Sequence, residues 1–384
     1  MNYKNLEDLY EIQRLYQKRG IVIVKGQGSK IFDESGKEYI DCIAGQGVAN
    51  IGHSNPDLIK AVKEQIEKIT ICPEIFYNDK RAEILEKLAS ISPIKNTRIF
   101  LCNSGAESIE AAIKFARFAT NKTDFICAFK SFHGRTYGAL SATHHSHYKE
   151  GFEPLVPGFE FVPFNNAEKI KEKVSDKTAG IILEVVQGIG GVRIADKEYL
   201  REVRKLCEEK NIILIIDEVQ SGFCRTGKMF ACQNFELEPD ILCCAKSIAG
   251  GLPMAAVLCS EKIKIDAGKH GSTFGGNPLS CAAALASINF MQERLLDKEA
   301  EEKGRFFMSK LSEIKSEKIK EVRGLGLMIG IELNEKVSQY VNSLQEKGVL
   351  VISAGPNVIR FLPPLIITYE EINFVLEKVK EVLK

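Results

Sequence analysis

The chain has 384 residues, more than a single hydrophobic core usually supports, so we expect more than one domain. Because 52 Lys and Arg residues nearly balance 51 Asp and Glu residues, no overall charge favours a nucleic-acid or membrane partner. The first twenty residues lack the apolar core of a signal peptide, and no stretch approaches about 20 uncharged apolar residues. We therefore expect a cytoplasmic protein.

The N-terminal part predicts a helix followed by a small antiparallel unit. Apolar residues of 1–18 lie near one side of a helix. Residues 21–45 predict two or three short antiparallel strands, with a hairpin turn at 33–36. The pair Asn55-Pro56 predicts the start of a helix over about 56–70.

From about residue 80, apolar runs alternate with helical stretches such as 105–118 and 197–210. This alternation predicts an α/β fold with a mostly parallel central sheet that is covered on both faces. The expected strands of this sheet are 98–102, 124–129, 180–185, 211–216 and 241–245.

The C-terminal part predicts a smaller α+β domain that also takes in the N-terminal strands. After the turn at 275–278 we expect a long helix, charged helices, two strand-like runs (326–333 and 349–355) and a last helix over 369–383. The glycine-rich segment 324–330 has the wrong spacing for a dinucleotide loop and is interpreted as packing within a strand-like run. We divide the chain into 1–45 (N-terminal segment of the small domain), 46–275 (large domain) and 276–384 (C-terminal small domain).

The eleven cysteines show no disulfide or metal framework, because their number is odd and none forms a Cys-x-x-Cys pair. Most lie within apolar runs, so we predict buried free thiols. The run His144-His145-Ser146-His147 has no carboxylate or cysteine beside it and is interpreted as a polar loop. No metal site is predicted.

The strongest functional signal lies in residues 211–251. One apolar run ends on Asp217 and the next ends on Lys246. Ligands of open α/β sheets collect beyond the carboxyl ends of such strands. A carboxylate and a lysine there suit pyridoxal 5′-phosphate (PLP), whose aldehyde forms a Schiff base with lysine and whose pyridinium nitrogen pairs with a carboxylate. The alternative is a lysine at the strand mouth in solvent.

The stretch Asn103-Ser104-Gly105-Ala106 joins a predicted strand to a helix. Free backbone N–H groups at a helix N-terminus favour a phosphate, Gly105 allows close approach, and Ser104 adds a hydroxyl. The alternative is an ordinary helix start, with Ser104 as N-cap and Glu107 completing a capping box.

Other polar or aromatic residues follow strand ends and have structural alternatives. Phe132 suits stacking on a flat ring or a place in the core, and Arg135 suits a carboxylate clamp or the surface. His133 is interpreted as a structural hydrogen-bond partner. Glu184 breaks an apolar run, so it lies at the surface or is paired in a site. Gln220 suits a contact with the cofactor's phenolic oxygen or a turn-stabilising amide.

Two later segments carry further candidates. In the turn-rich segment 271–278, the hydroxyls of Ser272 and Thr273 are placed to reach a phosphate. Arg360 lies inside an apolar run, where an unpaired guanidinium is expensive. A bound carboxylate or a structural salt bridge would explain it.

Together these motifs resemble the class III aminotransferases of the ornithine and acetylornithine type. The similarity covers nearly the whole chain and rests on NSGAE, FHGRT, IIDEVQ followed by CRTG, the lysine after ILCCA, and GSTFGGNP. Each motif is weak alone, but their order and spacing are specific. The resemblance implies fold type I of the PLP-dependent transferases, with a large α/β domain and a smaller α+β domain.

The resemblance implies roles for the matching residues. Lys246 is the expected Schiff-base lysine, Asp217 the pyridinium partner and Gln220 the phenolate contact. Thr273 matches a residue that reaches the phosphate of the neighbouring subunit, which implies a homodimer with shared sites. The full set of expected cofactor contacts is Ser104, Gly105, Ala106, Phe132, Glu184, Asp217, Gln220, Lys246 and Thr273.

Substrate contacts are implied in the same way. Arg135 matches the substrate-carboxylate arginine, Ser272 a nearby contact, and Arg360 the arginine that receives the α-carboxylate of glutamate. Gln46 lies where ornithine aminotransferases place a tyrosine that helps to hold free ornithine. The family usually has a second glutamate that gates the glutamate-binding arginine, and this chain has Ile189 there.

Within the family, the compact length and the ending SAGPNVIRFLPPL are most similar to the acetylornithine branch, including members that act on substrates carried by the small acidic protein LysW. We expect transamination of the terminal amine of an N-acylated or carrier-linked ornithine or lysine with 2-oxoglutarate, giving the semialdehyde and glutamate in arginine or lysine biosynthesis. The alternatives are an ornithine δ-aminotransferase, an aminomutase or decarboxylase, and a non-enzymatic PLP-fold binding protein.

Overall fold

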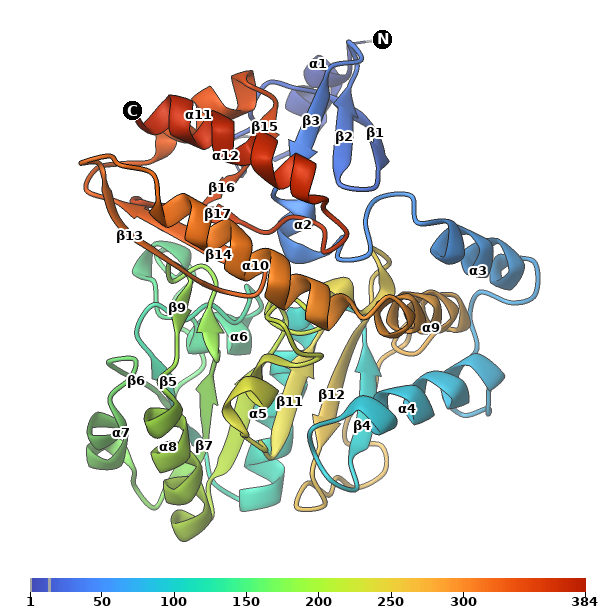
Figure 1. Cartoon of the computed structure of the whole chain (residues 1–384). Helices are drawn as coiled ribbons and strands as arrows, with labels where there is room; N and C mark the ends of the chain where they lie inside the picture. Colours follow the sequence, from blue (N-terminus) through green and yellow to red (C-terminus); the bar gives the residue numbers. More distant parts are fainter. Residues whose placement is uncertain (1, 13–14) are drawn as a thin grey trace.

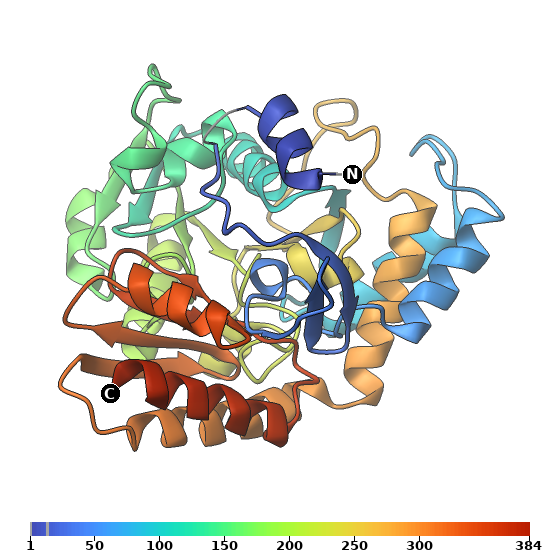
Figure 2. The ribbon, with the colours of Figure 1, turned by 90° about the horizontal axis from the view of Figure 1, so that it is seen from above.

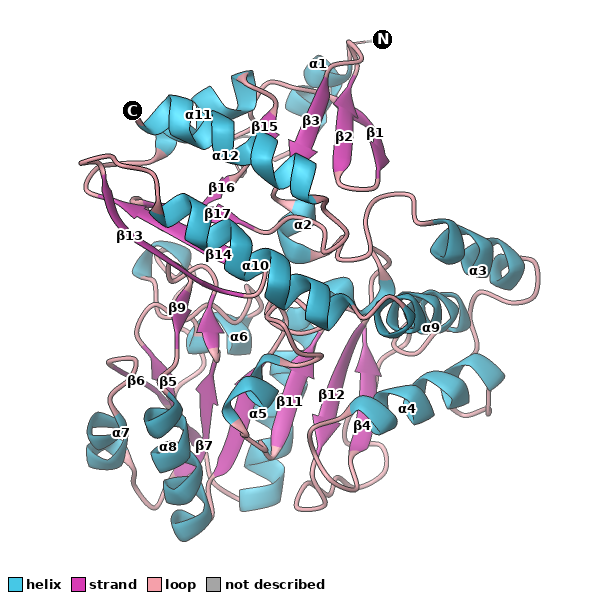
Figure 3. Cartoon of the chain, in the orientation of Figure 1, coloured by secondary structure: helices cyan, strands magenta, loops and turns pink. Residues whose placement is uncertain are grey.

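The computed structural model describes residues 2–12 and 15–384 of the chain. Within these residues, the largest sheet has seven strands in the order β4-β12-β11-β10-β7-β5-β6. Only the pairs that involve β12 are antiparallel, which confirms the mostly parallel sheet. Its strands lie side by side in Figure 3. Their bounds are β4 (Arg98–Cys102), β5 (Asp124–Ala128), β6 (Phe159–Val162), β7 (Thr178–Leu183), β10 (Ile213–Asp217), β11 (Ile241–Cys244) and β12 (Ala255–Cys259).

Helices cover both faces of this sheet. Successive strand residues point to opposite sides, so the apolar side chains of each strand pack against helices on both faces. Ile215 of β10 packs in one hydrophobic cluster with Phe115 of α5 (Gly105–Thr120). Ile216, the next residue, packs in another cluster with Val203 of α8 (Lys197–Lys210). Burial on both faces explains why these strands are continuous apolar runs in the sequence. The other helices of this region are α3 (Pro56–Ile66), α4 (Asp79–Ile91), α6 (Tyr137–Ala142), α7 (Ala167–Lys173) and α9 (Pro278–Glu293).

The N-terminal strands and the C-terminal elements lie together above the central sheet (Figure 1). One sheet has the order β1-β2-β3-β15 and another the order β13-β14-β17-β16. Seen from above, the first strands lie beside the C-terminal elements (Figure 2). This arrangement agrees with the expected small domain, whose boundaries stay a prediction. The elements are β1 (Ile23–Gln27), β2 (Lys30–Asp33), β3 (Glu38–Asp41), β13 (Ile319–Leu325), β14 (Met328–Leu333), β15 (Val349–Leu350), β16 (Ile352–Ser353), β17 (Val358–Phe361), α10 (Leu296–Ser312), α11 (Ser338–Glu346) and α12 (Tyr369–Leu383).

Three predicted elements differ from the structure. The helix expected over 1–18 is α1 (Tyr3–Tyr10), whose residues are not buried, so no core packing extends it; residues 1, 13 and 14 lie outside the described residues. The expected run 349–355 is divided, because β15 pairs with β3 whereas β16 pairs with β17. The segment 324–330 is not inside one strand but spans the end of β13, the turn and the start of β14.

Short elements complete the described chain. They are α2 (Ala44–Gly47), β8 (Val186–Gln187), β9 (Arg193–Ile194) and the 3₁₀ turns Ser146–Tyr148, Ala231–Phe235 and Lys246–Ala249. All eleven cysteines are free thiols and all except Cys72 are buried, as predicted. Over the described residues, no helix has both the length and the apolar character needed to cross a membrane.

Candidate active site

The register of two strands brings Asp217 and Lys246 to the same edge of the central sheet. Strand β10 runs parallel to β11, with Asp217 opposite Cys243, and Lys246 follows three residues later. Lys246 begins a 3₁₀ turn and has a left-handed backbone (φ 46°), which is strained for a residue other than glycine. Both residues line a cavity of about 360 Å³. Its other walls include Asn103, Ser104, Gly105, Ala106, Phe132, His133, Glu184, Ile189, Val219 and Gln220.

Lys246 is the most reactive amine that this cavity offers. Burial lowers its pKa to about 8; the negative charge of Asp217 opposes this shift, and the positive charge of Arg360 adds to it. A lysine with a lowered pKa presents a neutral, nucleophilic amine at mild pH. Lys246 is half-buried and lines the cavity, so the structure favours a site over the alternative of a lysine in solvent.

The carboxylate of Asp217 is held by two hydrogen bonds. One oxygen lies 2.7 Å from Nδ1 of His133, and the other accepts the backbone N–H of Val219 at 3.0 Å. Burial alone would lower the pKa of His133, but the bond and the charge of Asp217 outweigh it and raise that pKa. His133 is thus a hydrogen-bond partner, as predicted, and its partner is the acid at the strand end.

The predicted phosphate turn lies at the start of α5. The hydroxyl of Ser104 accepts the N–H of Glu107 at 3.2 Å, but the carboxylate of Glu107 accepts from the backbone and side chain of Asn103 and not from the N–H of Ser104. The capping box considered from the sequence is therefore incomplete. A Cβ at Gly105 would lie 2.7 Å from Cγ1 of Val219, so this turn requires glycine. A helix N-terminus that lines the cavity suits an anion.

Phe132 and Glu184 form one wall. The backbone N–H of Phe132 donates to Glu184 Oε2 at 3.1 Å, and the Phe132 ring meets Tyr148 edge-on at 5.3 Å. Glu184 is buried, and burial raises its pKa to about 7. Glu184 is therefore paired inside the site and positions the backbone of the ring-stacking candidate. Its expected role toward the cofactor stays a prediction.

Gln220 connects the cavity to two distant segments. Its Oε1 accepts from Nη1 of Arg360 at 2.9 Å, and its Nε2 donates to the carbonyl of Gln46 at 3.1 Å. Gln46 lies in a left-handed turn (φ 65°) of α2. The structure thus gathers Gln46, Gln220 and Arg360, whose contacts with substrate or cofactor remain predictions.

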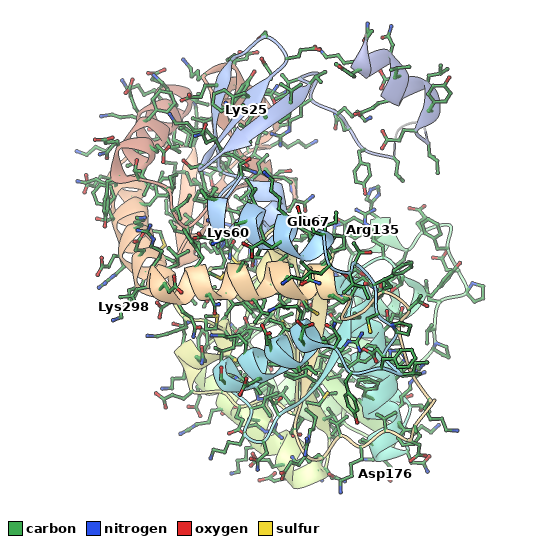
Figure 4. All side chains as sticks on the ribbon, turned by 90° about the vertical axis from the view of Figure 1, so that its right-hand side faces the viewer. Lys25, Lys60, Glu67, Arg135, Asp176 and Lys298 are labelled. Carbon is green, nitrogen blue, oxygen red and sulfur yellow. The ribbon has the colours of Figure 1, made fainter. Side chains whose placement is uncertain are left out.

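The remaining candidates lie apart from the cavity wall. Arg135 is exposed, and its guanidinium carbon lies 5.0 Å from the centre of the Tyr148 ring; the side chain is at the surface in Figure 4. Ser272 accepts from Nδ2 of Asn103 at 3.1 Å, so it is tied to the phosphate turn. Thr273 is exposed in the single chain.

Sequence reasoning missed two features of the site. It identified neither the bond between His133 and Asp217 nor the place of Tyr148 between Phe132 and Arg135. The only signal for His133 was its place directly after Phe132 at a strand end. Tyr148 lies in a short 3₁₀ turn, and nothing in the sequence around it indicates a site.

The chemical groups of this cavity fit PLP: a lysine with a low pKa, a buried acid and a helix N-terminus. The family model described as aminotransferase class III matches residues 12–383.

A [LysW]-aminoadipate semialdehyde transaminase of Deinococcus radiodurans is 48% identical to the chain, over 96% of the chain and 87% of that protein. An acetylornithine aminotransferase of Methanocaldococcus jannaschii is 46% identical, over 99% of the chain and 98% of that protein. The structure of the ornithine aminotransferase of Toxoplasma gondii superposes with a TM-score of 0.95 and 32% identity, over 99% of this chain and 94% of that one. The chain therefore belongs to the class III aminotransferases, PLP enzymes of fold type I, as the motifs predicted.

Proposed function

We propose that this aminotransferase acts on the terminal amine of an N-acylated or carrier-linked ornithine or lysine, with 2-oxoglutarate as amine acceptor. The products are the semialdehyde and glutamate. The observation that carries the proposal is the lowered pKa of Lys246 in a cavity shared with Asp217. The substrate class is supported by the names of the two relatives that are 48% and 46% identical to the chain.

Five residues of the candidate site have separate tasks in this reaction. PLP supplies the electron sink that stabilises negative charge on the substrate carbon. Lys246 holds the cofactor and then moves a proton at its Nζ to and from that carbon. Asp217, oriented by His133, keeps a proton on the ring nitrogen. Arg135 and Arg360 bind carboxylates of the substrates.

The substrate is tested by comparing kcat/KM for acetylornithine, free ornithine and a carrier-linked substrate. The proposal expects a blocked or carrier-linked substrate to exceed free ornithine. If free ornithine is the best donor, the enzyme is an ornithine δ-aminotransferase. An enzyme that does not exchange its amino group with glutamate in a half-reaction would be an aminomutase or decarboxylase.

A carrier protein is part of this proposal, since two relatives are named for LysW-linked substrates. Docking of an acidic carrier depends on charge, so kcat/KM for the carrier-linked substrate should fall as salt is raised. The same salt series with acetylornithine is the control, because a small substrate needs no protein docking. Equal salt dependence for both substrates would argue against a carrier.

We also propose a homodimer with shared sites. The single chain exposes large apolar side chains in residues 66–77 and at Phe274, next to the exposed Thr273 in sequence, and Arg81 ties the two segments together by bonds to the carbonyls of Phe76 and Gly276. Monomers rarely expose contiguous apolar patches of large area. Thr273 is then the partner's contact with the cofactor phosphate. The exposed apolar residues are Ile66, Ile69, Ile71, Ile75, Phe76, Tyr77 and Phe274.

A mixing experiment tests the shared site. Thr273→Ala and Lys246→Ala each damage a different half of the same site, so mixed dimers should contain one intact site and regain activity. Light scattering should give twice the chain mass. A monomer, or no recovery after mixing variants that are shown to exchange subunits, would contradict the proposal.

A further inference from the structure

Arg360 is a buried cation without a charged partner. Its side chain lies on β17 between β14 and β16, and only 1% of the residue is exposed. In the part of the chain that the structure describes, no carboxylate lies within ion-pair distance of it. Nη1 donates to Gln220, whereas Nε is buried and has no partner. A buried guanidinium with an unpaired N–H group and no carboxylate nearby favours the binding of an anion.

Gln220 is held at both ends of its amide. Oε1 accepts from Arg360, and Nε2 donates to the carbonyl of Gln46. The residue follows Asp217 by three positions, so the same loop carries the acid of the cofactor site. The amide of Gln220 therefore joins the catalytic strand end to the buried arginine.

The neighbouring wall leaves room for this amide but, among the described residues, places no carboxylate within ion-pair distance of Arg360. A Cβ at Gly188 would lie 1.9 Å from Oε1 of Gln220, so any other side chain there would displace the amide. Ile189, the next residue, lines the cavity and is apolar. Glu184 is an acid of this wall, and its charge opposes the lowering of the Arg360 pKa by burial. Its oxygens, however, accept backbone N–H groups of Phe132 and Gly188. The side chain of Arg360 therefore donates its hydrogen bond to the neutral amide of Gln220 and not to a carboxylate.

We propose that Gln220 occupies the carboxylate position at Arg360 in the substrate-free enzyme and is exchanged for the carboxylate of glutamate or 2-oxoglutarate. Gln220 is then a positioning residue that sets the affinity for the dicarboxylate substrates. The inference rests on the proposed function, because it takes Arg360 as the site of their carboxylate.

The charge of the partner decides how easily this exchange occurs. A neutral amide makes a weaker bond to a guanidinium than a carboxylate does, because only the carboxylate adds attraction between opposite charges. The incoming carboxylate therefore replaces a weaker acceptor and brings the missing negative charge. If residue 220 were an acid, its ion pair with Arg360 would have to break before the substrate carboxylate could bind.

The test measures binding of glutarate to the PLP-loaded enzyme by calorimetry. Glutarate has two carboxylates but neither an amine nor a keto group, so it binds without reacting. Gln220→Glu should weaken glutarate binding by about tenfold or more, because the new carboxylate pairs with Arg360. Gln220→Ala removes the competing acceptor without adding charge, so glutarate should bind several-fold more tightly to the PLP-saturated variant than to the wild type.

Two further variants separate the possible failures. Arg360→Ala should abolish measurable glutarate binding; if it does not, Arg360 is not the carboxylate site and that part of the proposed function fails. If Arg360→Ala abolishes binding but Gln220→Ala weakens it to a similar degree, Gln220 assists binding and the exchange is wrong.

Ile189→Glu places an acid beside the same amide without altering Gln220, and it should also weaken glutarate binding. Unchanged binding in both acidic variants would likewise overturn the exchange.

Discussion

The two sides of the candidate site, of which only the first lines the cavity, are built in different ways. The strand-end side consists of Asp217 and Lys246, which follow the adjacent strands β10 and β11, and of His133, which is hydrogen-bonded to Asp217. The arginine side consists of Arg135, which is exposed, and Arg360, which is buried and lacks a carboxylate. In the proposed function, the residues at the sheet edge carry the reaction, whereas residues from distant segments bind the substrates. Changes on the first side should reduce every reaction, and changes on the second should alter selectivity.

The largest expected effect is that of Lys246→Ala on the strand-end side. Turnover should fall by more than about 10³-fold with every substrate, because both the nucleophile and the proton carrier are lost. The purified variant should also lose the yellow colour of the bound cofactor. The matched control is Lys298→Ala, at an exposed helix position labelled in Figure 4. Full activity of Lys246→Ala would contradict the site.

A smaller loss is expected for Asp217→Asn. The amide keeps the shape of the side chain but removes the charge that stabilises a protonated ring nitrogen, so kcat should fall by about 10²-fold in both half-reactions. Single-turnover absorbance measurements with glutamate and with the amine donor would report each half separately. Asp176→Asn, at an exposed position, is the control. A loss confined to one half-reaction would show that Asp217 acts on a substrate.

On the other side, Arg135→Ala should raise KM by about tenfold for carboxylate substrates, with a smaller change in kcat. Arg135→Lys keeps the charge but loses the two-pronged donor geometry and the planar group over Tyr148, so it should recover only part of the loss. Arg201→Lys, at an exposed helix position, controls for a general effect of the substitution. An equal fall of kcat with all substrates would place Arg135 among the groups of the reaction centre.

The smallest effect concerns the pH dependence of cofactor capture. The pKa of Lys246 is lowered to about 8, so its neutral fraction in the cofactor-free protein rises as pH increases through that value. The rate of PLP capture should increase about fivefold from pH 7 to pH 8 and level off above pH 9. Stopped-flow absorbance would measure the rate. A rate that still rises about tenfold per pH unit up to pH 10 would indicate a lysine with an ordinary pKa.

Much of the fold could be predicted because its signals are local. The bounds of β4 and α8 agree with the expected ones, since uninterrupted apolar runs and helical periodicity depend only on neighbouring residues. The run 349–355 could not be divided correctly, because the two partner strands β3 and β17 come from opposite ends of the chain. Pairing between distant segments leaves little trace in a single sequence.

The sequence by itself determined that Asp217 and Lys246 meet in one place, since each follows a buried strand and parallel strands end at one edge. Only the tertiary structure decided what those residues touch. It placed His133 against Asp217, lowered the pKa of Lys246 by burial, and left the buried Arg360 with the amide of Gln220. Burial and hydrogen-bond partners depend on segments that are distant in sequence, and they determine the protonation and selectivity of the site.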